Sequence, residues 1–303
     1  MIDQRLSSNA LESRAVYECT PSLLHRLHFQ NTDYRMFESA EQYSSMAQDH
    51  VNEALYILTR YEHEVNGGDD EIVLDVGCGS GDVTVQVLGR MKRWKQIVGI
   101  DFNSAMIEFA NRNAPDVNKY SFEVVNFNKP ISEEFSKKKF NKIFSFFALQ
   151  WMKNRRTVAQ NIYDLLAPGG QAFLLLVSYS KIYEIWDDIA ESSEWKNHIP
   201  FSGPLNELVY AEKPEELVIA PLKDVGLKIV KSEILERKNA FKANEDTDDS
   251  KIEKLKTVDP FLKSIPVEKK DRYLEDLLER VKTKIGPNGA TDYTALIVIA
   301  QKD

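Results

Sequence analysis

The sequence predicts an α/β fold built on a doubly wound, mostly parallel, seven-stranded sheet. Two observations carry this prediction. Short apolar runs alternate along the chain with segments of helical periodicity, which is typical of repeated strand–helix units. In addition, the run Ile72–Leu74 ends in Asp75 and a glycine-rich turn, after which Val83–Leu88 has a helical pattern. A strand, a tight turn and a helix start, in that order, form the ligand-binding unit of such sheets.

Each expected element rests on a local pattern. Apolar runs bounded by turn residues predict strands over residues 71–76, 96–100, 120–125, 142–147, 171–177, 228–236 and 293–300. Apolar residues at helical spacing predict helices over residues 39–66, 82–91, 105–113, 157–166 and 269–284. The turn Asn66–Asp70 ends the first helix, Asn103 caps the third, and Pro168–Gly170 stops the fourth.

The chain divides into a polar N-terminal extension, residues 1–38, and one domain over residues 39–303. Two segments interrupt the strand–helix alternation. The first, about 179–225, holds Trp186 and Trp195 at helical spacing, and the second, about 239–290, begins with an acidic stretch and contains the helix 269–284. Insertions beside the carboxyl ends of parallel strands commonly cover the ligand site. We therefore expect these two insertions to form a helical lid.

The composition of the chain limits the kinds of partner and ligand that we expect. The 39 basic and 47 acidic residues give a net charge of −8, which argues against nucleic acid as the main partner. Two cysteines form no disulfide framework, so we expect a reducing, cytoplasmic location. No apolar run is long enough to span a membrane, and the five histidines lack metal-ligand spacing, so we expect neither a membrane span nor a metal. Whether the chain forms a homodimer is left open.

The glycine turn indicates the kind of ligand. Gly77, Gly79 and Gly81 are spaced more tightly than the G-x-G-x-x-G pattern of a dinucleotide site, and the Gly-Lys-Ser/Thr of a phosphate-binding loop is absent. Asp82 opens the following helix, which disfavours a pyrophosphate there. A carboxylate before the loop, Asp75, suits a positively charged ligand. This combination favours S-adenosylmethionine, which carries an ammonium and a sulfonium, and it resembles motif I of the class I methyltransferases.

Further residues are expected to bind this cofactor. Asp101 ends the second strand 20 residues after Gly81, where an acid can hold both ribose hydroxyls. Phe102 and Met106 are candidates for flanking the adenine ring, and the Asn126 amide could receive its amino group. The alternatives are a core role for Met106 and a solvated strand end at Asn126. The full expected set is Tyr43, Asp75, Gly77, Cys78, Gly79, Gly81, Asp101, Phe102, Met106, Asn126, Phe127 and Phe146.

Three residues are candidates for contacting the methyl acceptor. Gln150 is the one polar side chain in the apolar stretch Phe146–Met152 after the fourth strand, and Trp151 offers an indole N–H and an apolar wall. His50 lies in the helix before the first strand, together with Tyr43. The alternatives are a backbone partner for Gln150, plain core packing for Trp151 and a surface position for His50.

Taken with these motifs and candidate residues, the segment 40–302 resembles insect juvenile hormone acid methyltransferase and its arthropod relatives. The similarity rests on Tyr43, Ala54-Leu55, Val73–Gly81, Val98–Asp101, Phe144–Trp151, Asn161–Leu166, Ile182–Glu184, Trp195, Asp224–Gly226, Asp259–Phe261 and Tyr273–Leu277. It implies a Rossmann-like fold and methyl transfer from S-adenosylmethionine to a farnesoic, juvenile hormone or fatty acid. In the family, a glutamine in the lid helix and a histidine and tryptophan after the fourth strand hold the carboxylate. Here His50 stands at the position of that glutamine and Gln150 at that of the histidine, while Trp151 keeps the third. These departures are either a reciprocal exchange around the acid or the mark of a different substrate.

The resulting functional hypothesis is a carboxyl O-methyltransferase for an apolar acid, with His50, Gln150 and Trp151 orienting the acid. A carboxylate is already a nucleophile at neutral pH, so catalysis would come from placement. One alternative is methylation of a small polar acid such as an aconitate, which would need several arginines, whereas only Arg155 and Arg156 follow the fourth strand. The other alternative is a protein that binds S-adenosylmethionine without turnover.

Overall fold

The computed structural model describes residues 39–65, 68, 70–91, 94–199, 203–241, 247–286 and 291–303. The expected N-terminal extension, residues 1–38, lies outside these ranges. So do most of the Asn66–Asp70 turn and residues 242–246, in the acidic stretch of the second insertion.

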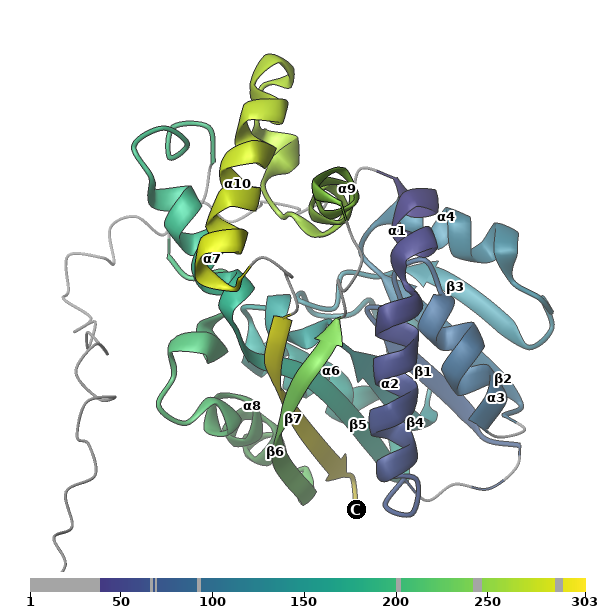
Figure 1. Ribbon diagram of the computed structural model, residues 1–303. Helices are drawn as coiled ribbons and strands as arrows, with labels where there is room; N and C mark the ends of the chain where they lie inside the picture. The colour runs from purple at the N-terminus through teal and green to yellow at the C-terminus, as the bar shows by residue number, and fades with distance from the viewer. Residues whose placement is uncertain are drawn as a thin grey trace, which may run out of the picture. The chain divides into compact units, whose positions relative to one another are not determined.

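A seven-stranded sheet with the order β3-β2-β1-β4-β5-β7-β6 forms the centre of the described chain (Figure 1). The strands are β1 Ile72–Val76, β2 Gln96–Asp101, β3 Tyr120–Val124, β4 Phe140–Phe146, β5 Leu166–Ser180, β6 Lys228–Phe241 and β7 Thr291–Gln301. The first five strands pair in parallel, and β7 runs antiparallel to both β5 and β6. The predicted fold class and all seven strands are confirmed, with β5 and β6 extending beyond the expected ranges.

The helices are α1 Ala40–Met46, α2 Gln48–Arg60, α3 Gly89–Met91, α4 Ser104–Asn113, α5 Glu133–Ser136, α6 Arg155–Leu165, α7 Lys181–Glu191, α8 Pro214–Asp224, α9 Asp248–Val258 and α10 Lys270–Lys284. Two expectations need correction. The helix expected over 39–66 is two helices, because the Ala47 N–H bonds to the Ser44 carbonyl and tightens the turn between them. The helix expected over 82–91 has a π-helical middle, Thr84–Leu88.

Alternating side chains of the strands form two cores, one on each face of the sheet. The first core joins the strands to α2, α4, α7 and α10, and includes Phe144 and Phe173. The second joins them to α6 and α8, and includes Leu174 and Leu176. Because α8 packs on α6 in this second core, it belongs to the sheet's own covering and not to an insertion over 179–225.

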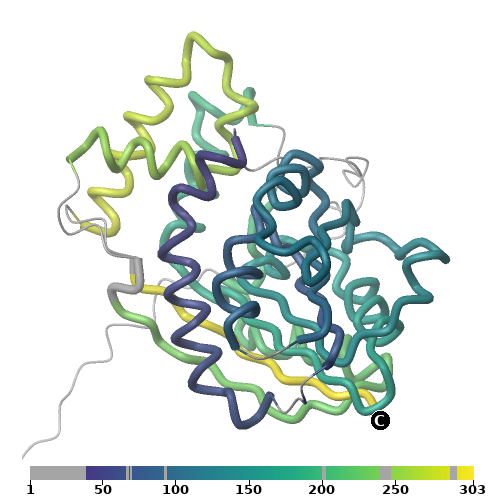
Figure 2. The backbone as a smooth tube through the Cα atoms, turned by 90° about the vertical axis from the view of Figure 1, so that its right-hand side faces the viewer, coloured from purple at the N-terminus to yellow at the C-terminus, as the bar shows by residue number. Residues whose placement is uncertain are grey.

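The helices of the two sequence insertions gather beyond one end of the sheet. Helix α10 contacts both α7 and α9 there, and Figure 1 shows these helices past the carboxyl ends of the parallel strands. In Figure 2 the yellow-green segments of α9 and α10 lie together at the same end, at the top of the view. Helix α1 also contacts α9. The prediction for 269–284 is confirmed as α10, whose apolar face is buried. This arrangement places the insertions next to the edge where the glycine turn lies.

Candidate active site

The loop after β1 has a backbone that glycine adopts without strain. Gly77, Gly79 and Gly81 have φ angles of 76°, 54° and 84°. The Gly77 N–H donates to the Ile100 carbonyl at 2.8 Å, which ties the loop to the end of β2. A side chain at Gly79 would meet the Tyr43 ring, 3.3 Å from the new Cβ atom. The glycines therefore let neighbouring side chains pack directly against the backbone of this loop.

Asp75 is the penultimate residue of β1, two residues before Gly77, and it is 2% exposed. The Thr84 hydroxyl donates to its carboxylate at 2.6 Å. Burial raises the pKa of Asp75 to about 7, and the nearby Asp101 carboxylate adds to the increase, while the Thr84 hydrogen bond opposes it. A cation in contact with Asp75 would stabilise its ionised form. Asp75 therefore fits the ammonium of S-adenosylmethionine.

Asp101, at the end of β2, faces the same loop. One of its carboxylate oxygens accepts the Gly79 N–H at 3.1 Å, and the other accepts the Asn103 N–H at 2.9 Å. Burial raises the pKa of Asp101, and these backbone hydrogen bonds oppose the shift. Since an ionised carboxylate has about four acceptor positions, the fixed group keeps capacity for two ribose hydroxyls.

The remaining cofactor candidates differ in how accessible they are. Phe102 is partly exposed after β2, whereas Met106 is buried in α4 at 2% exposure. The Asn126 side-chain oxygen accepts the Asn128 N–H at 3.1 Å and so shapes the turn after β3. The Phe127 ring packs in the second core.

Two further candidates, Cys78 and Phe146, pack in the first core. The Phe146 ring stacks on Phe144 at a centroid distance of 6.1 Å. Burial raises the pKa of the Cys78 thiol well above its usual value, so the side chain is a neutral filler.

Helices α1 and α2 bring Tyr43 and His50 to the glycine loop. The Ser44 hydroxyl donates to Asp82 at 3.1 Å, which attaches α1 to the loop, and Tyr43 lies against Gly79. The His50 ring is 6.2 Å from the Tyr43 ring, and burial lowers the His50 pKa. His50 is therefore a neutral imidazole at neutral pH, and it is partly exposed.

The segment after β4 turns sharply beside the same loop. Phe147 has a φ of 56°, and its carbonyl accepts the Gln150 amide N–H at 2.7 Å. A Cβ atom on Gly77 would lie 2.2 Å from the Ala148 Cβ, so this turn and the glycine loop are in close contact. Gln150 is 2% exposed, and its amide nitrogen has the backbone partner that the sequence left as an alternative.

Trp151 closes the 3₁₀ turn η3, Leu149–Trp151, and packs against α7. Its ring centroid is 5.4 Å from that of Tyr183 and 6.2 Å from that of Trp186. Trp151 is partly exposed, whereas Tyr183 and Trp186 are each 4% exposed. These three aromatic side chains form a wall next to the turn after β4.

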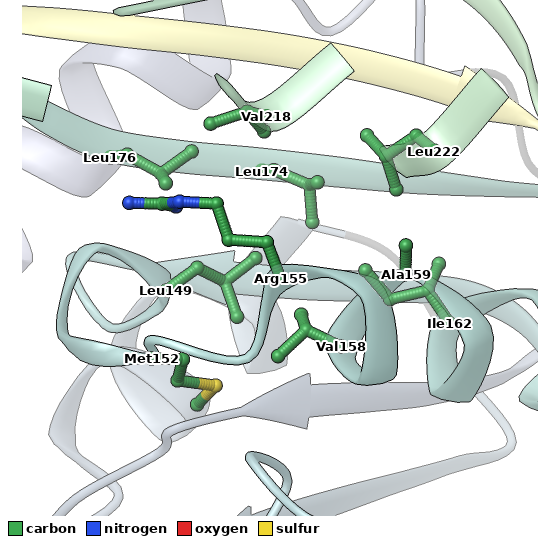
Figure 3. A pocket seen from close by; sticks show the side chains of 10 residues that line it. All are labelled: Leu149, Met152, Arg155, Val158, Ala159, Ile162, Leu174, Leu176, Val218 and Leu222. Atoms are coloured by element: carbon green, nitrogen blue, oxygen red, sulfur yellow. The ribbon is translucent and has the colours of Figure 1, made fainter. Parts of the chain in front are cut away.

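A cavity of about 20 Å³ lies on the other side of η3 (Figure 3). Apolar side chains of α6, α8 and β5 line it, together with Leu149 and Met152 at the two ends of η3. Arg155 also lines it, with Glu207 as an ion-pair partner at 3.9 Å. Because this space holds little more than one water molecule, it is too small for a substrate.

The structure brings Tyr43 and Asp101 together at Gly79 and places His50 near Tyr43, and it adds other residues. Phe147 contributes a ring beside His50, Tyr293 contributes one beside Phe147, and Tyr183 contributes one beside Trp151. The sequence offered no signal for Phe147, because an aromatic residue with positive φ is rare. Tyr183 and Tyr293 belong to elements far along the chain, so only the fold brings them to this edge.

Neither a membrane-spanning helix nor a metal site is found among the described residues. No helix there has the length and apolar character needed to cross a membrane. Nor do three or more histidine, cysteine, aspartate or glutamate side chains of the described residues group in a way that could hold a metal ion.

The sheet order, the antiparallel β7 and the glycine loop between two aspartates define a class I S-adenosylmethionine-dependent methyltransferase. A family model described as "Methyltransferase domain" matches residues 68–241, and the chain belongs to this family.

Two relatives are similar over most of this chain, and a solved structure shares its fold. The juvenile hormone acid O-methyltransferase of Drosophila melanogaster is 27% identical, covering 80% of this chain and 82% of the relative. That of Bombyx mori is 25% identical over 76% and 84%. The solved structure of Haemonchus contortus phosphoethanolamine N-methyltransferase 2 with S-adenosyl-L-methionine aligns with a TM-score of 0.52 at 16% identity, covering 87% of this chain and 56% of that one.

Proposed function

We propose that this protein methylates the carboxylate of an apolar acid, with S-adenosylmethionine as the methyl donor. The observation that carries the proposal is the character of the edge beside the glycine loop. It presents the neutral His50, the Trp151 indole and a wall of aromatic rings. An apolar tail packs against such surfaces, and one or two neutral donors suffice to orient its carboxylate.

The arginines support an apolar acid over a polar one. A small polycarboxylate would need several cations in the pocket. Arg155 instead lines the cavity behind η3 and pairs with Glu207, and Arg156 is exposed. The two curated juvenile hormone acid O-methyltransferases, similar over most of this chain, favour the same substrate class.

The mechanism follows from positioning. The bound cofactor supplies a methyl group on a positively charged sulfur, and the acid supplies its own nucleophilic oxygen. The Trp151 indole N–H and the single N–H of the neutral His50 would hold one carboxylate oxygen and direct the other toward the methyl group. Gln150 would act through the backbone, because its amide nitrogen holds the Phe147 carbonyl and so shapes the turn that carries Trp151. Asp75 and Asp101 would anchor the cofactor.

The direct test is a methyl-transfer assay with labelled S-adenosylmethionine. Farnesoic, juvenile hormone and fatty acids are compared with trans-aconitate and with a phenol and an amine. We expect methyl ester from the apolar acids. Product from the phenol or amine alone would contradict carboxyl transfer, and ester from aconitate alone would contradict the apolar tail. Cofactor binding by calorimetry without turnover on any acid would identify a non-catalytic binding protein.

Trp151→Phe tests the indole donor. The ring is kept and the N–H is lost, so we expect kcat to fall by about 100-fold while the cofactor Kd stays within about twofold. Trp195→Phe is the matched control, because the Trp195 N–H donates to Asp276 in the helical insertion, at 2.7 Å. That control should lower stability by about 1 kcal/mol and leave kcat unchanged. Equal losses of kcat and of cofactor affinity in Trp151→Phe would show a structural role.

A further inference from the structure

Phe147 has a conformation that is unfavourable for an aromatic residue. Its φ of 56° lies in the left-handed region, where the Cβ atom crowds the following carbonyl. Among the described residues, Asp70 is the one other non-glycine residue with positive φ. Such strain persists only where the surroundings impose it, and it concentrates at functional sites.

The surroundings hold both sides of the Phe147 peptide. Its N–H donates to the Leu175 carbonyl on β5 at 2.8 Å, which continues the pairing of β4 with β5. Its carbonyl accepts the Gln150 amide at 2.7 Å. The left-handed turn therefore sits between a fixed strand and the 3₁₀ turn that carries Trp151.

The left-handed turn also determines on which face of the sheet the Phe147 ring packs. Along β4, Phe144 and Phe146 point into the first core, whereas the Ser145 hydroxyl binds the Val76 carbonyl. Continued extended backbone would turn residue 147 to the second core. The left-handed turn instead packs the Phe147 ring against the first core.

There the ring contacts side chains of two different elements. It is 5.5 Å from the His50 ring, in an edge contact, and 6.3 Å from the Tyr293 ring. The Tyr293 hydroxyl donates to Glu53 at 2.7 Å, and Glu53 lies one helical turn after His50 on α2. Helix α2 therefore supplies His50 on one side of Phe147 and fixes Tyr293 on the other.

We propose that Phe147 is a positioning residue that sets the distance between the cofactor loop and the acid-orienting side chains, and so limits the size of the acid that fits. The inference rests on the function proposed above. Ala148 touches Gly77 of the cofactor loop, the Phe147 ring contacts His50, and the Phe147 carbonyl holds the turn that carries Trp151. One strained residue thus connects the methyl donor's loop to both proposed donors of the acceptor side.

The test separates the ring from the backbone with four variants. Phe147→Gly removes the ring and relieves the strain, Phe147→Ala removes the ring and keeps the strain, and Phe147→Asn tolerates positive φ and secures a folded variant. Phe147→Leu restores apolar bulk. Asp70→Gly is the matched control, because Asp70 has a φ of 74° in an exposed turn before β1. Steady-state kinetics are measured with one short and one long apolar acid, and cofactor Kd by calorimetry.

We expect kcat/KM for the short acid to fall about tenfold or more in Phe147→Gly and Phe147→Asn, with cofactor Kd within about twofold. The preference for the long acid should rise about tenfold, and Phe147→Leu should recover most of the loss. Wild-type kinetics in Phe147→Gly and Phe147→Asn, or a matching loss of cofactor affinity, would overturn the inference. A wild-type protein that methylates no acid overturns the proposed function instead, so the two failures are distinguishable.

Discussion

At the scale of single residues, the site is a set of polar groups held at one edge of an apolar sheet. Asp75 and Asp101 could be predicted from sequence, because each ends an apolar strand at a defined distance from the glycines. Gly77 could be predicted as a turn residue, but its contact with Ala148 could not, since the two strand ends are far apart in sequence. Phe147 could not be predicted, because its conformation is imposed by Leu175, Gln150 and its ring neighbours.

Asp75 makes the stability of the cofactor-free protein depend on pH. The unfolded chain ionises Asp75 near its ordinary pKa of 3.8, whereas the folded protein keeps it protonated up to about 7. The unfolded state therefore binds fewer protons between these values, and stability falls as pH rises from about 4 to about 7. Asp75→Asn should remove this contribution. The measurement is urea unfolding of both proteins at several pH values, and an equal slope in both would contradict the assignment.

Cofactor binding should reverse this effect. The ammonium of the cofactor favours ionised Asp75, so binding below about pH 7 is accompanied by proton release. Calorimetry in two buffers of different ionisation enthalpy measures that proton, and Asp75→Asn should release less of it. Affinity in the wild type should weaken as pH falls below about 7.

At the scale of elements, strands were easier to predict than helix boundaries. Parallel strands buried on both faces leave continuous apolar runs, so all of them could be located. The break at Ala47 has no glycine or proline to mark it, and the π-helical turn after the glycine loop has no sequence signature. The sequence pattern places α8 in an insertion, because its packing on α6 is a tertiary contact that hydrophobic periodicity does not reveal.

The connection between α9 and α10 depends on one buried carboxylate. Asp259 accepts hydrogen bonds from the Phe261 and Leu262 N–H groups, at 2.9 and 2.7 Å, and from the Tyr273 hydroxyl. Burial raises the pKa of Asp259 to about 6. Asp259→Ala leaves these donors unpaired and should lower the free energy of unfolding by about 3 kcal/mol. Asp259→Asn keeps an acceptor oxygen and should cost less than about 1 kcal/mol. Chemical denaturation compares them, and equal losses would show that charge, not hydrogen bonding, matters.

At the scale of the whole molecule, one edge of the sheet collects groups from α1, α2, the glycine loop, the turn after β4 and α7. Fold class and cofactor class could be predicted because they depend on short local motifs at strand ends. The acceptor side could be predicted only in part, since its wall combines Trp151 with Tyr183 and Trp186 from α7, and since Tyr293, which contacts the Phe147 ring, comes from β7.

The order of the strands also constrains how the protein is made. Strand β7 lies between β5 and β6, yet the chain reaches it after the other six strands. Until β7 emerges from the ribosome, β5 exposes a long apolar edge and β6 has no partner, and such unpaired edges promote association between chains. The nascent polypeptide is therefore most prone to association until β7, the strand next to the β6 edge, has been synthesised and inserted.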